Sequence, residues 1–306
     1  RAARPLGVEV AALHVNHGLM PPADAWQEHV RLQCARWRRA GWPLDFRAQR
    51  LGGGPPAGDS VEAWARRERY LALAQMAHEL KIDAVLLAHH RSDQAETVLL
   101  QALRGAGSAG LSAMPAEAHR SDMWWFRPWL DQPRRAIEAY VRRHRLSYVE
   151  DDSNADPRFA RNRLRHQVWP ALVRAFPHAE AALAASARRQ HEADECLSEL
   201  AILDARVTLS ADGFGLCIQA WGELSPARQA NLLRHWLSSL FKHGVPDSLI
   251  KRVVSELPRP VAAPAGLPQK VCCGFGGDGC CGLRRRLDRG SAADLLQCSK
   301  YNARLT

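Results

Sequence analysis

Four side chains suited to proton transfer or cation binding lie within one short stretch of the sequence. His89 and His90 end an apolar run, and Asp93 and Glu96 follow shortly after. The apolar run is typical of a strand buried on both faces of a parallel sheet, and the residues from Asp93 onward have the composition of a helix. On a helix the two carboxylates would share one face. We therefore expect proton-transfer chemistry, or a metal–phosphate ligand set, at the carboxyl end of a central strand, where open α/β sheets bind ligands.

The same residues have a structural explanation that the sequence does not exclude. The histidines can be ordinary polar residues at a strand end, while Asp93 caps the following helix and Glu96 pairs within its first turn. A His-His-x-x-Asp match is only moderately specific. The choice between the two interpretations therefore depends on the segments around the cluster.

A second apolar segment precedes this cluster in the chain. Residues 8–16 are expected to form a strand that ends at Asn16-His17 and a turn glycine. Such a strand would deliver a polar pair to the same sheet edge as His89. A strand-end turn without any function has the same pattern, so the pair is weak support by itself.

The helix expected over residues 59–80 carries the basic candidates next to the cluster. It opens with a capping-box-like pattern, in which Asp59 is followed by a glutamate three residues later. Arg66 and Arg67 are interpreted as a solvated basic face. Arg69 is the better candidate for a functional residue.

Two later segments are candidates for covering or holding a polyanion. Arg104 opens a glycine-rich loop that ends at Met114, and this loop is either a mobile cover or a plain connector. Residues 150–165 begin as an acidic, turn-rich loop and end in a dense arginine run. Such runs are usually solvated, but this one could hold an RNA backbone or a nucleotide. Its members are Arg158, Arg161, Asn162, Arg163 and Arg165.

The composition is that of a globular protein with a basic balance. The formal net charge is +10 and the pI is about 9.6, which favours a polyanionic partner because clustered basic side chains release phosphate counterions. The excess of arginine over lysine could equally reflect a GC-rich genome. No apolar stretch approaches the ~20 residues that span a bilayer, and the first residues lack a signal-peptide core. We therefore expect a cytoplasmic protein without a membrane partner.

Strand signals nearly vanish beyond Val168, which indicates two differently built parts. We expect an α/β domain over residues 1–165, a mostly helical domain over 166–258 and an irregular tail over 259–306. The tail contains adjacent cysteine pairs without the usual Cys-x-x-Cys spacing of zinc sites. Disorder, or translation out of frame, is therefore favoured over zinc binding for the tail.

Several separated motifs occur together in the order found in one family. They are Asn16-His17-Gly18-Leu19, Arg69-Tyr70, His89-His90-x-x-Asp93-Gln94-Ala95-Glu96-Thr97, the glycine loop from Arg104 to Met114, Arg127-Pro128-Trp129-Leu130, Glu150-Asp151-x-Ser153-Asn154 and Arg161-Asn162-x-Leu164-Arg165. Over about residues 8–255 the chain resembles tRNA(Ile)-lysidine synthases, members of the PP-loop ATP pyrophosphatase group. The ordered set is highly specific, although no single motif is.

The resemblance implies a fold and a reaction. The fold is a parallel sheet of the adenine-nucleotide α-hydrolase type flanked by helices, with a second, mostly helical substrate-binding domain. The reaction uses ATP and Mg²⁺ to join free L-lysine to C2 of the wobble cytidine in the CAU anticodon of tRNA(Ile), through an adenylated intermediate. The resemblance is also compatible with a homodimer.

Residue roles follow from the same resemblance, position by position. The catalytic residues it implies are His89, Asp93 and Glu96, with Asp93 also as a metal ligand. The nucleotide and lysine pocket would contain Asn16, His17, Arg69 and His90. The tRNA contacts would come from Arg104, Arg158, Arg161, Asn162 and Arg165.

The chain also departs from the family pattern. The signature Ser-Gly-Gly-x-Asp-Ser, whose backbone amides would hold the pyrophosphate at a helix N-terminus, does not occur in the sequence. Met20 stands where the family usually has arginine. We therefore expect an N-terminally truncated fragment that lacks the PP-loop and is inactive by itself.

Two alternatives remain open. One is another PP-loop tRNA-modifying enzyme, such as a cytidine thiolase, which the lack of paired cysteines in the body of the chain disfavours. The other is a non-catalytic basic RNA-binding protein that lost the phosphate loop.

Overall fold

The computed structural model describes residues 5–18, 20–56, 58, 60–150, 156–241 and 245–257, together with the backbone of a strand at 272–274. Several sequence-based expectations fall outside these residues. They concern Leu19, Asp59, the turn at 151–155 and all of the 259–306 tail except 272–274.

The chain divides into two compact units, Arg1–His191 and Glu192–Thr306. This division lies well beyond the boundary expected at residue 165. The reason is that the next helices remain fastened to the first unit. Glu180 accepts hydrogen bonds from Arg91 Nε at 2.8 Å and from Ser92 Oγ at 3.1 Å.

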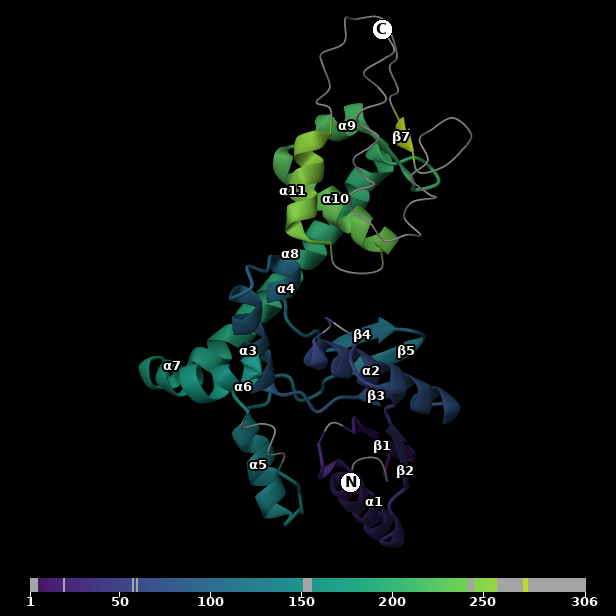
Figure 1. Ribbon diagram of the computed structural model, residues 1–306, viewed down its shortest axis with the longest axis vertical. Helices are drawn as coiled ribbons and strands as arrows, with labels where there is room; N and C mark the ends of the chain where they lie inside the picture. The colour runs from purple at the N-terminus through teal and green to yellow at the C-terminus, as the bar shows by residue number, and fades with distance from the viewer. Residues whose placement is uncertain are drawn as a thin grey trace, which may run out of the picture. The chain divides into compact units, whose positions relative to one another are not determined.

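Helices follow most of the described strands of the first unit, and only β4 and β5 are adjacent in the chain without a helix between them (Figure 1). Its strands are β1 (Val10–Asn16), β2 (Leu44–Arg50), β3 (Ala84–Leu86), β4 (Glu117–Arg120) and β5 (Met123–Phe126). Its helices are α1 (Ala23–Arg39), α2 (Val61–Glu79), α3 (Arg91–Ala102), α4 (Ser108–Leu111), α5 (Arg134–Arg143), α6 (Ala160–Arg163), the π-helical turn η2 (Leu164–Val168), α7 (Trp169–Ala175) and the first part of α8 (Ala179–Thr208). The expected α/β class is confirmed.

The described strands of this unit form two sheets. In one sheet β1 pairs parallel with β2. In the other, β3 pairs parallel with β5 and β4 pairs antiparallel with β5, so that the order is β3-β5-β4. The polar motifs singled out in the sequence follow the carboxyl ends of two of these strands. Asn16-His17 lies at the end of β1, and His89-His90 lies between β3 and α3. Ligands of α/β proteins commonly bind at such strand ends.

Helix α2 covers one face of the β3-β5-β4 sheet. Val85 and Trp125 pack against the α2 residues Leu73, Met76 and Ala77. The opposite face is less covered, and Leu86 is 69% exposed. The expectation of a strand buried on both faces is therefore wrong for β3, because among the described residues packing covers only the side of Val85.

The glycine loop after α3 has a fixed end. Gln94 is buried on α3, and its amide donates to the backbone oxygen of Met114 at 2.9 Å. The backbone N–H of Met114 donates in return to Gln94 Oε1 at 3.0 Å. The loop also contains the single helical turn α4. These contacts favour a connector whose last residue is fixed.

The second unit is mostly helical, as expected. It contains the second part of α8, β6 (Gly215–Cys217), α9 (Ile218–Gly222), α10 (Pro226–Phe241), α11 (Asp247–Glu256) and β7 (Cys272–Gly274). Its core includes Trp221, Leu232, Leu233, Trp236 and Ile250, and β6 pairs antiparallel with β7. Among the described residues of both units, no helix is long and apolar enough to cross a bilayer.

Candidate active site

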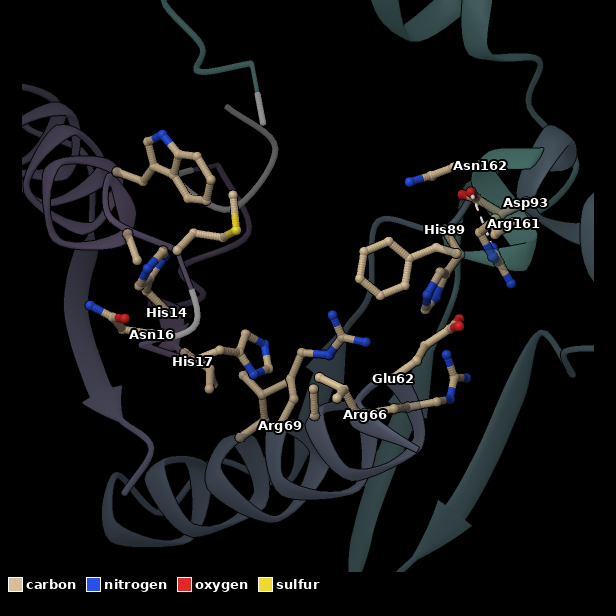
Figure 2. Close-up of a pocket in the computed structure, with 18 of the residues that line it drawn as sticks. His14, Asn16, His17, Glu62, Arg66, Arg69, His89, Asp93, Arg161 and Asn162 are labelled. Carbon is tan, nitrogen blue, oxygen red and sulfur yellow. Dashed lines mark ion pairs between the residues drawn. The ribbon is translucent and has the colours of Figure 1, made fainter. Parts of the chain in front are cut away.

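A cavity of about 650 Å³ opens in the first unit (Figure 2). The end of β1, the start of α1, the first half of α2 and the start of α3 form its walls, together with the arginine run of α6 and η2. It brings together eight residues that the sequence predicts for the site: Asn16, His17, Arg69, His89, Asp93, Arg161, Asn162 and Arg165. The cavity is therefore the candidate active site. The strand-end motifs meet here, but among the described strands β1 and β3 belong to two different sheets, so the expectation that they share one sheet edge is wrong.

Asp93 lines one wall of the cavity, and Glu96 is buried outside the lining but forms an acid pair with Asp93 that two arginines hold. The guanidinium of Arg165 donates to both carboxylate oxygens of Glu96, at 2.6 Å from Nε and 2.9 Å from Nη2. The same Nη2 lies 3.0 Å from Asp93 Oδ1. Arg161 Nη1 lies 3.5 Å from Glu96 and 3.8 Å from Asp93. The two positive charges therefore balance the two negative charges.

Asp93 also has the structural role that the sequence left open. Its second oxygen, Oδ2, accepts the backbone N–H of His90 at 3.0 Å, so that the side chain caps α3. The His90 ring lies beside the same oxygen, with Nδ1 at 3.4 Å. His90 is thus placed at the start of α3 behind the acid pair, and it does not line the cavity.

The acid pair as it stands does not fit a magnesium ion. Mg²⁺ requires oxygen ligands in near-ideal octahedral geometry, commonly one or two carboxylates plus substrate phosphates. Every carboxylate oxygen of Asp93 and Glu96 already accepts a hydrogen bond. Within the described part of the chain, no group of three or more His, Cys, Asp or Glu side chains could hold a metal ion. The predicted metal role of Asp93 therefore has no support in this arrangement.

His89 lines the cavity next to the acid pair and is neutral at physiological pH. Burial and the positive charge of Arg127 lower its pKa from 6.5 to about 4, although Asp93 acts in the opposite direction. Arg127 is itself buried and donates to the backbone oxygen of Pro115 at 2.9 Å and to Tyr70 Oη at 3.2 Å. A neutral imidazole can donate from one nitrogen and accept at the other, which suits a phosphate or a proton in transfer.

Two arginines on α2, Arg66 and Arg69, point into the cavity (Figure 2). Burial lowers the pKa of Arg69, and the nearby charges of Arg66 and Arg161 lower it further. In the described part of the chain, neither Arg66 nor Arg69 forms an ion pair, although the Arg66 guanidinium lies 5.3 Å from the centre of the Tyr70 ring. The site therefore has an excess of positive charge, which favours a polyanion such as a nucleotide.

The interpretation of Arg66 as a solvated residue is incomplete, because Arg66 is exposed as expected but also borders the cavity. Arg66 lines the cavity, whereas its neighbour Arg67 does not. The signal that could have found it is spacing, because Arg66 lies three residues before Arg69 and so shares its helix face. Other lining residues that were not predicted to belong to the site include His14, Trp26, Glu62 and Phe159.

At the end of β1, Asn16 is a structural residue that also borders the cavity. It is buried, and its amide donates to Asp24 Oδ1 at 2.7 Å and to Gln27 Oε1 at 3.3 Å. Its Oδ1 accepts the backbone N–H of Gly18 at 2.9 Å. Gly18 has φ of 66°, a left-handed conformation that favours glycine. This turn aims His17 into the cavity, where burial and the charge of Arg69 lower the pKa of its ring.

Two predicted RNA-binding arginines do not join the cavity lining. Arg104 is exposed beyond the end of α3. Arg158 pairs with Asp156, with Nη2 and Oδ2 2.7 Å apart, and its side chain is 86% exposed. Asn162, by contrast, is buried and fastens the turn before α6 by donating to the backbone oxygen of Asp156 at 2.9 Å. The arginine run is therefore divided between the cavity and the surface.

Comparisons with known proteins agree with this architecture. The family model for the PP-loop domain matches residues 1–172, and that for the TilS substrate-binding domain matches residues 216–269. The chain is 43% identical to the tRNA(Ile)-lysidine synthase of Bordetella bronchiseptica over 243 residues, which is 78% of this chain and 69% of that protein. It is 40% identical to the tRNA(Ile)-lysidine synthase of Alkalilimnicola ehrlichii over 248 residues, 81% of this chain but 54% of that protein.

A solved structure has a similar fold. It is the U34-tRNA thiolase NcsA from Methanococcus maripaludis with its [4Fe-4S] cluster, with a TM-score of 0.50 and 15% sequence identity over 60% of this chain and 62% of that chain. At this identity the likeness concerns the fold alone. It supports the PP-loop type of α/β architecture.

The family match corrects one expectation from the sequence. Because the match to the PP-loop domain begins at residue 1, the prediction that the chain lacks the PP-loop is wrong. The inactivity predicted from that absence therefore loses its basis. The match spans residues 1–172 although the sequence does not contain Ser-Gly-Gly-x-Asp-Ser.

Proposed function

Because the chain belongs to the tRNA(Ile)-lysidine synthase family, we propose that it ligates L-lysine to C2 of the wobble cytidine in the CAU anticodon of tRNA(Ile). In this reaction O2 of the cytosine attacks the α-phosphorus of ATP, and pyrophosphate leaves. The amine of lysine then attacks C2, AMP leaves with O2, and the amine loses a proton. The products are lysidine, AMP and pyrophosphate.

The observation that carries this proposal is the unequal charge of the cavity. Arg66, Arg69, Arg161 and Arg165 line it, but Glu62 and Asp93 are the only acidic side chains among its described lining residues. Attack on a phosphate needs positive groups that stabilise the developing charge before the reaction begins. Arginines meet this requirement because the guanidinium stays protonated, even at Arg69, where burial lowers the pKa.

Each side of the cavity has a distinct part in the proposal. Arg66 and Arg69 on α2, with His17 beside them, would bind the phosphates of ATP. Neutral His89 would hydrogen-bond the reacting phosphate or take the proton released by the amine. The acid pair is the complementary site for the ammonium group of lysine, since carboxylates pair with a primary ammonium over a short distance.

The remaining expectations stay predictions. Mg²⁺ is expected from the family resemblance, but no step is assigned to Asp93 as its ligand because the oxygens of Asp93 are occupied by hydrogen-bond donors. A homodimer and a cytoplasmic location are likewise not tested by the structure.

The proposal is tested by incubating the chain with ATP, radiolabelled lysine and a tRNA(Ile) transcript that has the CAU anticodon. We expect acid-precipitable label in the RNA, with one AMP and one pyrophosphate released per lysine incorporated. A transcript with UAU in place of CAU is the matched control and should incorporate no label. Binding of the CAU transcript without any incorporation would contradict the proposal and favour the non-catalytic RNA-binding alternative.

The thiolase alternative can be tested by adding a sulfide donor to the same reaction mixture. A thiolase needs cysteines near its nucleotide site, but no cysteine lines the cavity among the described residues, and Cys34 is buried in α1. We therefore expect no transfer of sulfur to the transcript from a sulfide donor. Sulfur incorporation without lysine incorporation would overturn the assignment.

A further inference from the structure

The acid pair is occupied by side chains of the protein itself. Arg165 contacts Glu96 at two points and Asp93 at a third, and the Glu96 side chain is only 6% exposed. Arg161 Nη1 also lies 3.5 Å from Glu96 and 3.8 Å from Asp93, so two cations already balance the two carboxylates and leave little capacity for a further cation. A lysine ammonium group therefore cannot pair with these carboxylates unless Arg165 moves.

Arg165 also lines the cavity that contains Arg66 and Arg69, the proposed phosphate-binding residues. Arg161 and Arg165 line the cavity together with Arg66 and Arg69, which have no carboxylate partner among the described residues. The charge of Arg161 already lowers the pKa of Arg69, which shows that the cations on the two walls are close enough to repel one another. A phosphate group in the cavity would relieve this repulsion and attract Arg165 away from the acid pair.

The backbone around Arg165 is π-helical and can convert to α-helical hydrogen bonding. Arg165 lies in the π-helical turn η2, between the α-helical turns α6 and α7. Pro170 has no N–H and cannot donate to the carbonyl of His166, so a regular α-helical ladder is interrupted here. π-Helical turns are frequent at functional sites, and a change between π and α winding would turn Arg165 about the helix axis.

We propose that Arg165 is a positioning residue that couples the two substrate sites: it occupies the acid pair until phosphate groups bound in the cavity draw it away, which opens the pair to the ammonium group of lysine. This inference rests on the proposed function, because the ammonium belongs to lysine. The phosphate can come from ATP or from the RNA backbone. Because coupling is reciprocal, bound lysine must then strengthen phosphate binding by the same factor.

The test is equilibrium dialysis of the full chain with radiolabelled lysine in three conditions. These are no other ligand, a non-hydrolysable ATP analogue with a methylene group between the α- and β-phosphates, and the CAU transcript of tRNA(Ile). For the unchanged protein we expect at least a tenfold increase in lysine affinity in one or both of the ligand conditions. The condition that gives the increase identifies the source of the phosphate.

For Arg165→Met we expect tight lysine binding without any phosphate ligand, and an increase of less than threefold when one is added. Arg165→Lys keeps the charge but loses the two-point contact, and it should show intermediate coupling, which provides a second measurement if the methionine variant folds poorly. Arg174→Met is the matched control, because Arg174 is an exposed arginine of α7 outside the cavity lining, and it should behave as the unchanged protein.

Two results would overturn the inference. One is an Arg165→Met protein with the same phosphate dependence as the unchanged protein, and the other is lysine binding by the unchanged protein that no phosphate ligand strengthens. If either result occurs while the unchanged protein still incorporates lysine into the transcript, the inference fails and the proposed function stands. If the unchanged protein neither binds nor incorporates lysine, both fail.

Discussion

The guanidinium of Arg165 and the carboxylate of Glu96 form a two-point contact of 2.6 and 2.9 Å, although 69 residues separate them in the sequence. This contact fastens the π-helical turn η2 to α3 and thereby closes one wall of the cavity. It also joins a residue predicted to bind RNA to a residue predicted to be catalytic. The two groups of predicted residues are therefore parts of one charged network.

The first prediction concerns the stability that this contact provides. Glu96→Leu leaves the guanidinium of Arg165 with a weaker partner in a mostly buried position, so we expect the free energy of unfolding to fall by about 3–5 kcal/mol. The double variant Glu96→Leu/Arg165→Met removes both charges and should recover most of this loss. Urea unfolding followed by tryptophan fluorescence measures the differences.

The exposed pair of Arg134 and Glu138, with Nε and Oε1 2.9 Å apart, is the control for the first prediction. Because water screens this pair, Glu138→Gln should change the free energy of unfolding by less than about 1 kcal/mol. Equal losses for Glu96→Leu and Glu138→Gln would show that the buried pair has no special role in stability.

The second prediction concerns the pH dependence that His89 causes. Its pKa is about 4 in the folded protein against 6.5 for an ordinary histidine, so the unfolded chain binds the extra proton between these values. The contribution of neutral His89 to the free energy of unfolding is therefore fully present above pH 6.5 and decreases as the pH falls toward 4. The slope is at most about 1.4 kcal/mol per pH unit, and less to the extent that solvent reaches the ring.

Comparison of His89→Asn with the unchanged protein isolates this contribution from those of the half-buried His14 and His17, whose pKa values burial also lowers. The asparagine variant should lose less stability than the unchanged protein between pH 6.5 and 4, as measured by urea unfolding at each pH. The exposed His78 provides a control through His78→Gln, which should follow the unchanged protein. Parallel pH profiles for His89→Asn and the unchanged protein would contradict the prediction.

The third prediction concerns the anchor of the glycine loop. Gln94→Ala removes both hydrogen bonds to the buried backbone of Met114, and each unsatisfied group costs about 1–3 kcal/mol. We expect a total loss of about 2–4 kcal/mol in the free energy of unfolding. Gln75→Ala on the exposed side of α2 should cost less than about 0.5 kcal/mol, since such surface changes are usually small. A similar small value for Gln94→Ala would mean that the loop end is not fixed in solution.

The fourth prediction concerns the phosphate-binding wall. Arg69→Met removes a partly buried guanidinium. Loss of a charged hydrogen-bond donor to phosphate is worth about 1.5–3 kcal/mol, so the Kd for ATP should rise about 10- to 100-fold. Arg67→Met is the matched variant, because Arg67 is exposed on α2 and outside the cavity lining. Dialysis with labelled ATP should show at most a twofold change for Arg67→Met. Equal effects of the two variants would indicate only a general dependence on net charge.

Local patterns in the sequence were sufficient to predict the strand and helix that carry the candidate site residues. The apolar run before His89 and the helical composition from Asp93 onward predict a strand followed by a helix, and both form as β3 and α3. The loss of strand signals after Val168 likewise predicts the helical character of the remaining chain. These features depend on spacing within a few residues, which is why one sequence is enough to recognise them.

The partners of each charged group were decided by the tertiary structure alone. No local pattern shows that Arg165 returns to Glu96, that Arg158 stays at the surface or that Arg66 faces the cavity. The same holds for Leu86, which an apolar run predicts to be buried and which is 69% exposed. Burial and ion pairing depend on which distant segments pack together, and that packing results from the sum of many weak contacts across the whole unit. The residue types at the site are therefore a property of the sequence, whereas their charge balance is a property of the fold.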